Sequence, residues 1–264
     1  MSEPFGTALR DWRDRRGVSQ LELAARAGVS QRHISFLETG RASPSRQMVV
    51  GLGRALDVPL RERNLLLDRA GFAPVYSARG LGSDELEHIR ETLQLIASAY
   101  EPFPAYVVDR SWNVVLSNGP AAALVGRLVE PTSAALQDGM NVAKLTFHPE
   151  GIRPALVNWE QAAAALLHRL ELELRERPND RELAELHAEI LDYPEVTDLP
   201  REPAVPTSSD LLVPLHLQGP QLELRLFTTI ATIGAAFDVT LDELRLESLL
   251  PADAESDATL RALV

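Results

Sequence analysis

Gln31 and Arg32 follow Ser30 at the expected start of a short helix, and both side chains match the edges of nucleic-acid bases. A glutamine amide can bond N6 and N7 of adenine, and an arginine guanidinium can bond O6 and N7 of guanine. Neither contact forms unless the helix that carries these residues enters the major groove of DNA. The chemistry is therefore that of base recognition, and it requires a scaffold that leaves one side of this helix exposed.

The scaffold begins with two short helices on either side of a glycine turn. The run Ser19-Gln20-Leu21-Glu22 has the pattern of a capping box and opens the first helix, which ends at Gly28. Ala24 permits a close approach of the second helix, and Gly28 supplies a backbone conformation that other residues adopt poorly. Leu37 fixes the second helix, residues 30–40, to the bundle by its inner side. We expect two helices that cross steeply, with the outer side of residues 30–40 free.

Apolar periodicity predicts a bundle of five helices before residue 73, at about 5–17, 19–28, 30–40, 45–56 and 60–70. Residues 1–73 hold 12 Arg and 8 acidic residues, a net charge of +4, whereas the rest of the chain holds 14 basic and 30 acidic residues, a net charge of −16. This asymmetry indicates a nucleic-acid partner for the basic end. The alternative is a solvated basic face on a helical bundle without DNA contacts.

Residues 19–30 and the run Leu37-Glu38-Thr39-Gly40-Arg41 resemble the lambda repressor and Cro-like helix-turn-helix family, often called the XRE family. The resemblance covers about 65 residues and implies sequence-specific binding to double-stranded DNA. It implies a phosphate contact for Gln20, base contacts for Gln31, Arg32 and Ser35, and phosphate contacts for Arg41, Ser43 and Arg46. It also implies a structural ion pair between Arg13 and Glu38. Phe36 touches a thymine methyl or packs against its neighbours.

The remainder of the chain predicts a second domain of mixed structure. A linker over 74–82 precedes a domain over 83–264, and the chain is therefore multidomain. Helices are predicted at about 83–99, 121–128, 158–175 and 180–192, and strands at 105–108, 114–116, 222–226, 227–233 and 244–249. The proline-rich segment 194–210 is predicted to be irregular. This order favours an α+β domain with an antiparallel sheet.

Residues 104–109, 114–118, 141–159 and 228–253 resemble the MmyB-like ligand-binding domain, which is PAS-like and follows a helix-turn-helix in its family. Some members of that family hold a fatty acid, so the resemblance implies a small apolar ligand and no other cofactor. Many relatives carry a Trp-containing stretch before the final strands. This chain has the proline-rich segment there instead, which puts the ligand and the shape of the pocket in doubt.

Four residues are candidates for ligand binding. Arg153 can pair with a carboxylate head group, and Trp159, Phe147 and Asn118 lie in the segments that carry the resemblance. The alternatives are a surface arginine, two core aromatic residues and an asparagine that caps a turn. Burial of an acyl chain would contribute about 0.8 kcal/mol to the free energy of binding for each methylene, before the entropic cost of association is subtracted.

Other features limit the remaining classes of function. The chain has no Cys, which excludes disulfides and thiolate metal sites, and its His spacing matches no metal site. No uncharged apolar run of 18 residues and no secretory signal occur, so we expect a cytoplasmic protein without a membrane partner. No catalytic motif is present, and we expect no enzyme.

Few phosphate contacts on one small module favour a homodimer on a palindromic operator. The alternatives are a C-terminal domain that serves only dimerisation or partner binding, and an enzyme fused to the helix-turn-helix.

Overall fold

A computed structural model describes residues 4–80, 86–200, 214–220, 222–234 and 236–263. The chain divides into two compact units. The first comprises Met1–Arg79 together with Ala235–Asp242, and the second comprises Gly80–Gly234 together with Glu243–Val264. We describe each unit separately.

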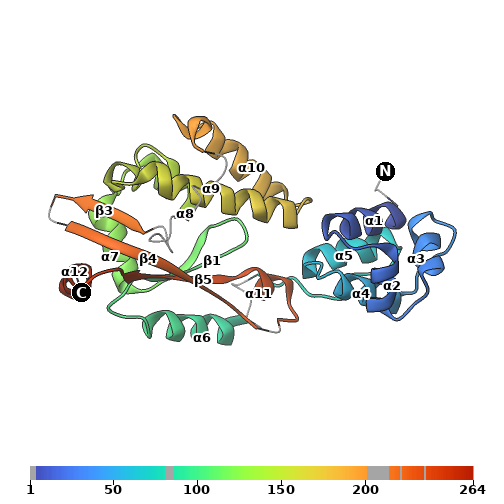
Figure 1. Cartoon of the computed structure of the whole chain (residues 1–264). Coiled ribbons are helices and arrows are strands. Elements are labelled where there is room, and N and C mark those ends of the chain that lie inside the picture. The colour runs from blue at the N-terminus through green and yellow to red at the C-terminus, as the bar shows by residue number, and fades with distance from the viewer. Residues whose placement is uncertain (1–3, 81–85, 201–213, 221, 235, 264) are drawn as a thin grey trace. The chain divides into compact units, whose positions relative to one another are not determined.

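The first unit is built on five short helices (Figure 1): α1 Phe5–Arg15, α2 Gln20–Ala27, α3 Gln31–Glu38, α4 Arg46–Ala55 and α5 Leu60–Arg69. Their inner faces form one apolar core that includes Leu9, Trp12, Leu23, Ile34 and Leu52. The predicted five-helix region is therefore confirmed.

Local side-chain bonds explain where these helices begin and end. The hydroxyls of Ser19, Ser30 and Ser45 each accept a bond from the backbone N–H three residues later, at 3.1, 3.2 and 3.2 Å. Each bond satisfies one of the N–H groups that a helix start leaves without an internal partner. Gly28 ends α2 with φ 68°, in the left-handed region that glycine adopts without a steric penalty.

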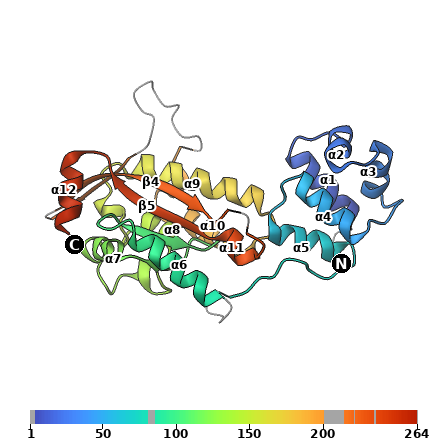
Figure 2. The ribbon, with the colours of Figure 1, turned by 90° about the horizontal axis from the view of Figure 1, so that it is seen from below.

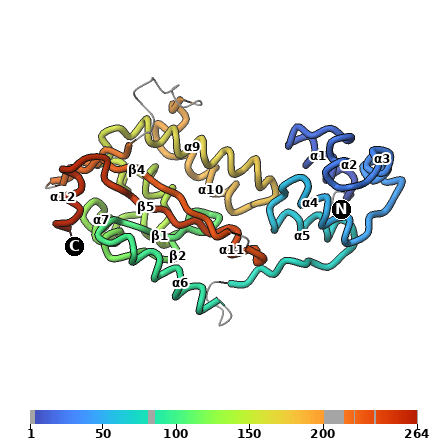
Figure 3. The backbone as a smooth tube through the Cα atoms, turned by 60° about the horizontal axis from the view of Figure 1, so that its bottom comes forward, coloured from blue at the N-terminus to red at the C-terminus, as the bar shows by residue number. Residues whose placement is uncertain are grey.

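The second unit contains a five-stranded antiparallel sheet with the strand order β2-β1-β5-β4-β3. Figure 3 labels four of these strands, β2, β1, β5 and β4, side by side. The strands are β1 Ala105–Val108, β2 Val114–Ser117, β3 Leu215–Gly219, β4 Leu222–Thr232 and β5 Arg245–Pro251. In the centre of the sheet, Glu247 of β5 pairs with Tyr106 of β1 and with Ile230 of β4. The predicted α+β domain with an antiparallel sheet is confirmed.

Helices cover both faces of this sheet (Figures 1 and 2). The helix α6 lies on one face, and α7, α8 and α9 cover the other face. The bounds are α6 Glu87–Ser98, α7 Gly119–Leu128, α8 Val142–Phe147, α9 Trp159–Glu176, α10 Arg181–Leu191 and α12 Ala254–Ala262, with 3-10 turns at Ala134–Leu136, Arg153–Ala155 and Val196–Asp198. None of the helices in the described ranges combines the length and apolar character needed to cross a membrane.

Several predicted elements differ from the structure. The two strands expected at 222–226 and 227–233 form the single strand β4, which pairs with β3 over residues 222–226 and with β5 over residues 226–232. The strand β3 and the helices α8 and α12 were not predicted. Residues 83–85 of the expected helix and residues 201–210 of the expected irregular segment lie outside the described residues.

The connection between β4 and β5 contributes to the first unit rather than the second. It contains α11, Val239–Glu243, whose Asp242 carboxylate accepts a bond from the backbone N–H of Leu60 at 3.4 Å. The carboxylate of Asp238 accepts a 2.8 Å bond from the hydroxyl of Ser77. Sequence periodicity gave no indication of this excursion, because it depends on contacts between residues more than 150 positions apart.

Candidate DNA-reading surface and ligand cavity

The helix α3 separates a buried side from an exposed side. Ile34 and Leu37 are buried in the core of the first unit, whereas Gln31 and Arg32 at the start of the helix are exposed. The guanidinium of Arg32 lies 5.1 Å from the centre of the Phe36 ring, one turn further on. This cation–π contact restrains a long side chain while leaving its donors available.

An ion-pair cluster holds the end of α3 to the preceding helices. Glu38 is only 5% exposed, and it accepts bonds from Arg13 Nε at 2.6 Å and from Gln20 Nε2 at 2.8 Å. The hydrogen bond with Glu38 raises the pKa of Arg13, against the opposing effect of burial. The expected ion pair between Arg13 and Glu38 is therefore present. The amide nitrogen of Gln20, an expected phosphate contact, is engaged with Glu38 inside the protein.

The remaining DNA-contact candidates lie in or beside α3. Arg41, Ser43 and Arg46 are exposed, and Ser35 is partly buried. The Arg46 guanidinium lies 5.9 Å from the ring of Phe72. Their roles at a DNA surface remain predictions.

A cavity in two compartments lies between the sheet and its covering helices in the second unit. One compartment has a volume of about 100 Å³ and the other about 210 Å³. Tyr106, Val142, Thr146 and Leu215 line both of them, so the two spaces adjoin. Together they reach the lower end of the volumes typical of small-molecule pockets, about 300 Å³.

The smaller compartment is almost entirely apolar. Besides the four shared residues, it is lined by Pro104, Val114, Ser117, Ala121, Leu124, Val125, Leu128, Met140, Leu145, Ile152, Leu217 and Leu249. Apart from the hydroxyls of Tyr106, Ser117 and Thr146, such a lining offers no polar side chain, and it favours hydrocarbon.

The larger compartment has a charged end. Arg169 Nη2 of α9 donates to Glu247 Oε1 of β5 at 2.6 Å, and the Tyr106 hydroxyl donates to Glu247 Oε2 at 3.2 Å. Burial and the neighbouring Glu247 carboxylate raise the pKa of Tyr106 well above its usual range. Tyr106 is therefore a neutral hydrogen-bond donor at this end of the cavity.

Next to Arg169 lies a partly buried cluster around Glu173. Its carboxylate is shared by Arg169 at 3.4 Å, by Arg177 at 2.8 Å and by Arg245 in a short contact. The fully buried Trp112 donates its indole N–H to the same carboxylate at 3.0 Å. Desolvation by burial lowers the pKa of Arg245, and the nearby positive charges act in the same direction, against the attraction of Glu173.

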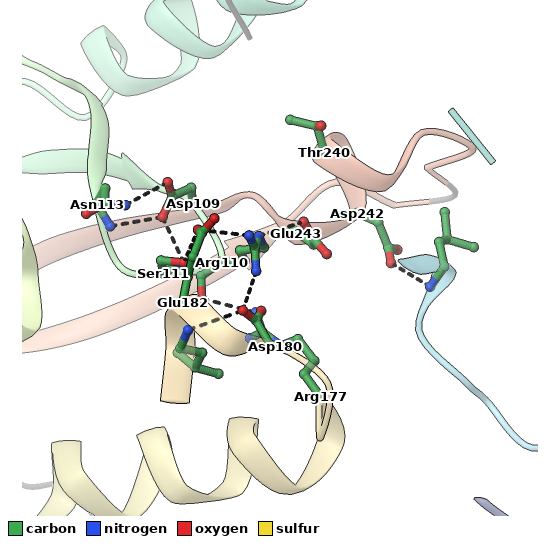
Figure 4. A network of polar contacts seen from close by, with 12 residues as sticks. Asp109, Arg110, Ser111, Asn113, Arg177, Asp180, Glu182, Thr240, Asp242 and Glu243 are labelled. Atoms are coloured by element: carbon green, nitrogen blue, oxygen red, sulfur yellow. Dashed lines mark hydrogen bonds and ion pairs between the residues drawn. The ribbon is translucent and has the colours of Figure 1, made fainter. Parts of the chain in front are cut away.

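Arg110 organises a second polar network in this unit (Figure 4). Its guanidinium contacts Asp180 in a short bond, Glu182 at 2.8 Å and Glu243 at 3.8 Å. It thereby ties the β1–β2 hairpin and the start of α10 to Glu243, the last residue of α11. Figure 4 also shows Asp242, the neighbour of Glu243, with its bond to a backbone N–H of the first unit.

The four ligand-binding candidates named from the sequence lie elsewhere. Arg153 pairs with Glu195 and lies 3.7 Å from the centre of the Trp159 ring, and these two candidates line a separate surface depression. Phe147 is fully buried in the core. The side chain of Asn118 bonds four backbone groups and caps α7. None of the four is among the described residues that line the two-compartment cavity.

Sequence reasoning missed the residues at the charged end of the cavity, Tyr106, Arg169 and Glu247. Tyr106 and Glu247 lie in strands that pair although they are 141 residues apart. A weak signal was the alternation of Arg245, Glu247 and Leu249, which places all three on one face of a strand.

Comparisons with known proteins assign both parts of the chain to regulator families. A family model of the MmyB-like transcription regulator ligand binding domain matches residues 89–263, and a model of a helix-turn-helix domain matches residues 4–66. The chain is similar to the clp gene regulator ClgR from C. glutamicum, a solved structure, with 33% identity over 25% of this chain and 83% of that chain and a TM-score of 0.23. No curated protein matches. The two family matches confirm both resemblances stated from the sequence.

Proposed function

Because this chain belongs to the MmyB-like family of transcription regulators, we propose that it binds one operator sequence through α3 and that an amphipathic ligand of the second unit controls this binding. The chain is a DNA-binding transcription regulator with a ligand-binding domain. The proposal adds the residues, the class of ligand and the route of control.

Base recognition is assigned to Gln31 and Arg32. Both side chains are exposed at the start of α3, and the opposite side of the helix is held in the core. Phe36 supports Arg32 in a position from which it can reach a guanine. We assign phosphate contacts to Arg41, Ser43 and Arg46, with secondary roles for Gln20 and Ser35. So few contacts from one unit favour a homodimer on a palindromic site.

The DNA assignment is tested by selecting the operator from a random DNA library and measuring affinity by fluorescence anisotropy. Replacing Arg32 by Ala should cost about 1–3 kcal/mol on the selected site and relax the preference at one base pair. Arg54→Ala is the matched control, since Arg54 is an exposed arginine of α4, and it should change affinity less than twofold. Equal loss from Arg32→Ala on all sequences would assign Arg32 to a phosphate instead. The stoichiometry of the complex, from analytical ultracentrifugation, tests the homodimer.

The observation that supports ligand sensing is the two-compartment cavity, apolar at one end and charged at the other. Such a space suits a molecule with a hydrocarbon chain and a polar head, and a fatty acid has both. Native mass spectrometry before and after delipidation tests this proposal. An extra mass that is lost on delipidation and restored by adding decanoic acid is the expected result. A chain that never carries an added mass would favour a domain that serves only dimerisation.

The proposed route by which a ligand controls DNA binding runs along the polypeptide from the cavity wall to the DNA-binding unit. The strands β4 and β5 both contribute residues to the cavity wall, Thr228 and Ile230 from β4 and Glu247 and Leu249 from β5. The segment that joins these two strands, Ala235–Asp242, belongs to the first unit. A ligand that shifts either strand therefore acts on a segment that is hydrogen-bonded within the DNA-binding unit.

A further inference from the structure

The second half of β4 lies at an open edge of the sheet. Residues 222–226 of this strand pair with β3 on one side, and residues 226–232 pair with β5 on the other side. Among the described residues, no strand continues β3 alongside residues 227–232. This half of β4 therefore has a paired strand on one side only.

The alternation of backbone groups along β4 shows which of them face the open edge. The carbonyl oxygen of Arg225 accepts a 2.8 Å bond from the N–H of Ala252, which follows β5, so the backbone groups of Arg225 point toward β5. Because these groups point alternately to the two sides of an antiparallel strand, those of Thr228, Ile230 and Thr232 point to the open edge. Each of these three residues offers one N–H donor and one carbonyl acceptor to a further strand.

The outer strands of the sheet are bonded on their outer sides, and this stretch of β4 is not. The N–H of Val114 in β2 donates to the carbonyl of Met140, and the carbonyl of His216 in β3 accepts from the N–H of Val157, both at 2.8 Å. An uncovered edge is usually protected from pairing by a charge, a proline or a bulge. Residues 227–233, Phe-Thr-Thr-Ile-Ala-Thr-Ile, contain no charge and no proline, and the register of 226–232 with β5 has no bulge.

We propose that residues 227–233 pair with the same residues of a second copy of this chain, antiparallel and across a two-fold axis at Ile230. The inference rests on the homodimer of the proposed function and names the surface that forms it. In a two-fold interface the residue at the axis faces its own counterpart, and the residues on either side exchange places. Ile230 then lies opposite its counterpart, and Thr228 lies opposite the counterpart of Thr232.

The order of residues in this stretch suits pairing with itself. Thr228 and Thr232 lie two positions before and after Ile230, so the pattern is the same in both directions. Opposed threonines and β-branched side chains stabilise antiparallel pairs, and no like charges meet. Ile230 is 47% exposed, and an added strand would cover part of it. A second copy also supplies the second DNA-binding unit that a palindromic operator requires.

The test places like charges at the axis and measures the dimer by analytical ultracentrifugation of the full chain. Ile230→Lys and Ile230→Glu should each raise the Kd of the dimer at least about tenfold, because like charges lie directly opposite. A mixture of the two variants should form a heterodimer, because opposite charges then meet. All chains are compared after delipidation, since Ile230 also lines the larger compartment.

Ile96→Lys is the matched control. Ile96 is 44% exposed and lies in α6, beside Leu95, which is 71% exposed. This surface is the alternative site for a second copy, but a helix has no row of open backbone groups. The dimer should therefore keep the wild-type Kd in Ile96→Lys. Loss of the dimer in this variant and not in Ile230→Lys would assign the interface to α6 and overturn the inference.

Hydrogen exchange followed by mass spectrometry gives a readout that needs no variant. A peptide spanning residues 227–233 of the wild type should exchange more slowly as the protein concentration rises through the Kd of the dimer, because the outward N–H groups become bonded. Equal protection at every concentration would assign the edge to a partner within the same chain and overturn the inference. This measurement decides the question if the Ile230 variants do not fold.

The outcomes separate the interface from the homodimer itself. A wild-type dimer whose Kd is unchanged in Ile230→Lys, or a mixture of the two charged variants that stays monomeric, overturns the β4 interface and leaves the homodimer standing. A wild type that stays monomeric both alone and on the selected operator overturns the two together. If the interface is correct, Ile230→Lys should bind the palindromic operator at least about tenfold more weakly, while its affinity for a single half-site stays within about twofold of the wild type.

Discussion

Gly6→Ala is predicted to destabilise the first unit although Gly6 lies inside a helix, where alanine is ordinarily the better residue. An added Cβ at Gly6 would lie 2.5 Å from the backbone oxygen of Leu37 and 2.7 Å from that of Glu38. Both atoms belong to the backbone of α3, so no side-chain rotation can relieve the contact. The helices α1 and α3 must separate, and such overpacking costs about 1–3 kcal/mol.

Two effects of opposite sign decide the net change. Alanine gains about 1 kcal/mol of helix propensity over glycine, which offsets part of the cost. The balance is a net loss of up to about 2 kcal/mol, which corresponds to a fall of up to roughly 15 °C in the melting temperature of a domain of this size. The matched control is Gly51→Ala in α4, where an added Cβ meets no atom within 4 Å. This control should stabilise the unit by about 1 kcal/mol.

The assay is thermal unfolding of the full chain combined with hydrogen exchange followed by mass spectrometry. Peptides from α1 and α3 report on the first unit alone, so a change there is not confused with unfolding of the sheet. Gly6→Ala should also weaken operator binding, because the end of α3 is displaced. If Gly6→Ala and Gly51→Ala both raised stability equally, the close approach of α1 to the backbone of α3 would be wrong.

Two further predictions concern coupling and pH. Replacing Asp238 by Ala removes its bond to Ser77. This variant should show a smaller effect of decanoic acid on operator affinity, measured by fluorescence anisotropy, while its affinity for the acid changes less than twofold. An effect of the acid as large as in the wild type would contradict the proposed route. Backbone and side-chain hydrogen bonds from Ser256 lower the pKa of Asp253, which caps α12. Because the folded-state pKa lies below the unfolded one, this cap stabilises the fold above the ordinary aspartate pKa, and its contribution is lost as the pH falls through the folded-state value. Ser256→Ala keeps the backbone bond, which is the larger cause, and removes the side-chain bond, so an NMR titration should show the pKa of Asp253 rising only part of the way to its ordinary value. An unchanged pKa would contradict a contribution from the Ser256 hydroxyl.

The helices that carry the candidate DNA-contact residues could be predicted from the sequence because their signals are local. Ser30 caps α3 through a backbone group only three residues away, and Gly28 ends α2 through its own backbone angles. Capping, periodicity and turn chemistry act over one or two helical turns, so they can be recognised without knowing the fold. The role of Gly6 was not predictable in this way, because the backbone it touches lies about 30 residues later in the chain.

The ligand cavity could not be predicted because distant segments assemble it. Arg169 comes from a helix, and Tyr106 and Glu247 come from strands that pair across most of the domain. Arg153 was named from the sequence as the partner of a carboxylate, since it lies near Asn158 and Trp159 in a segment that carries the family resemblance. In the structure Glu195 already pairs with Arg153. Nothing in the local sequence distinguishes Arg153 from Arg169.

The register of the central strands places charged side chains at one end of an otherwise apolar cavity. Arg245, Glu247 and Leu249 share one face of β5 because side chains alternate along a strand. The pairing of Glu247 with Tyr106 fixes that face toward the cavity. A slip of one residue would turn these side chains away and bring Leu246 and its alternate neighbours toward α9. The cavity would then lack Glu247, and the guanidinium of Arg169 on α9 would lose its counter-charge on the sheet.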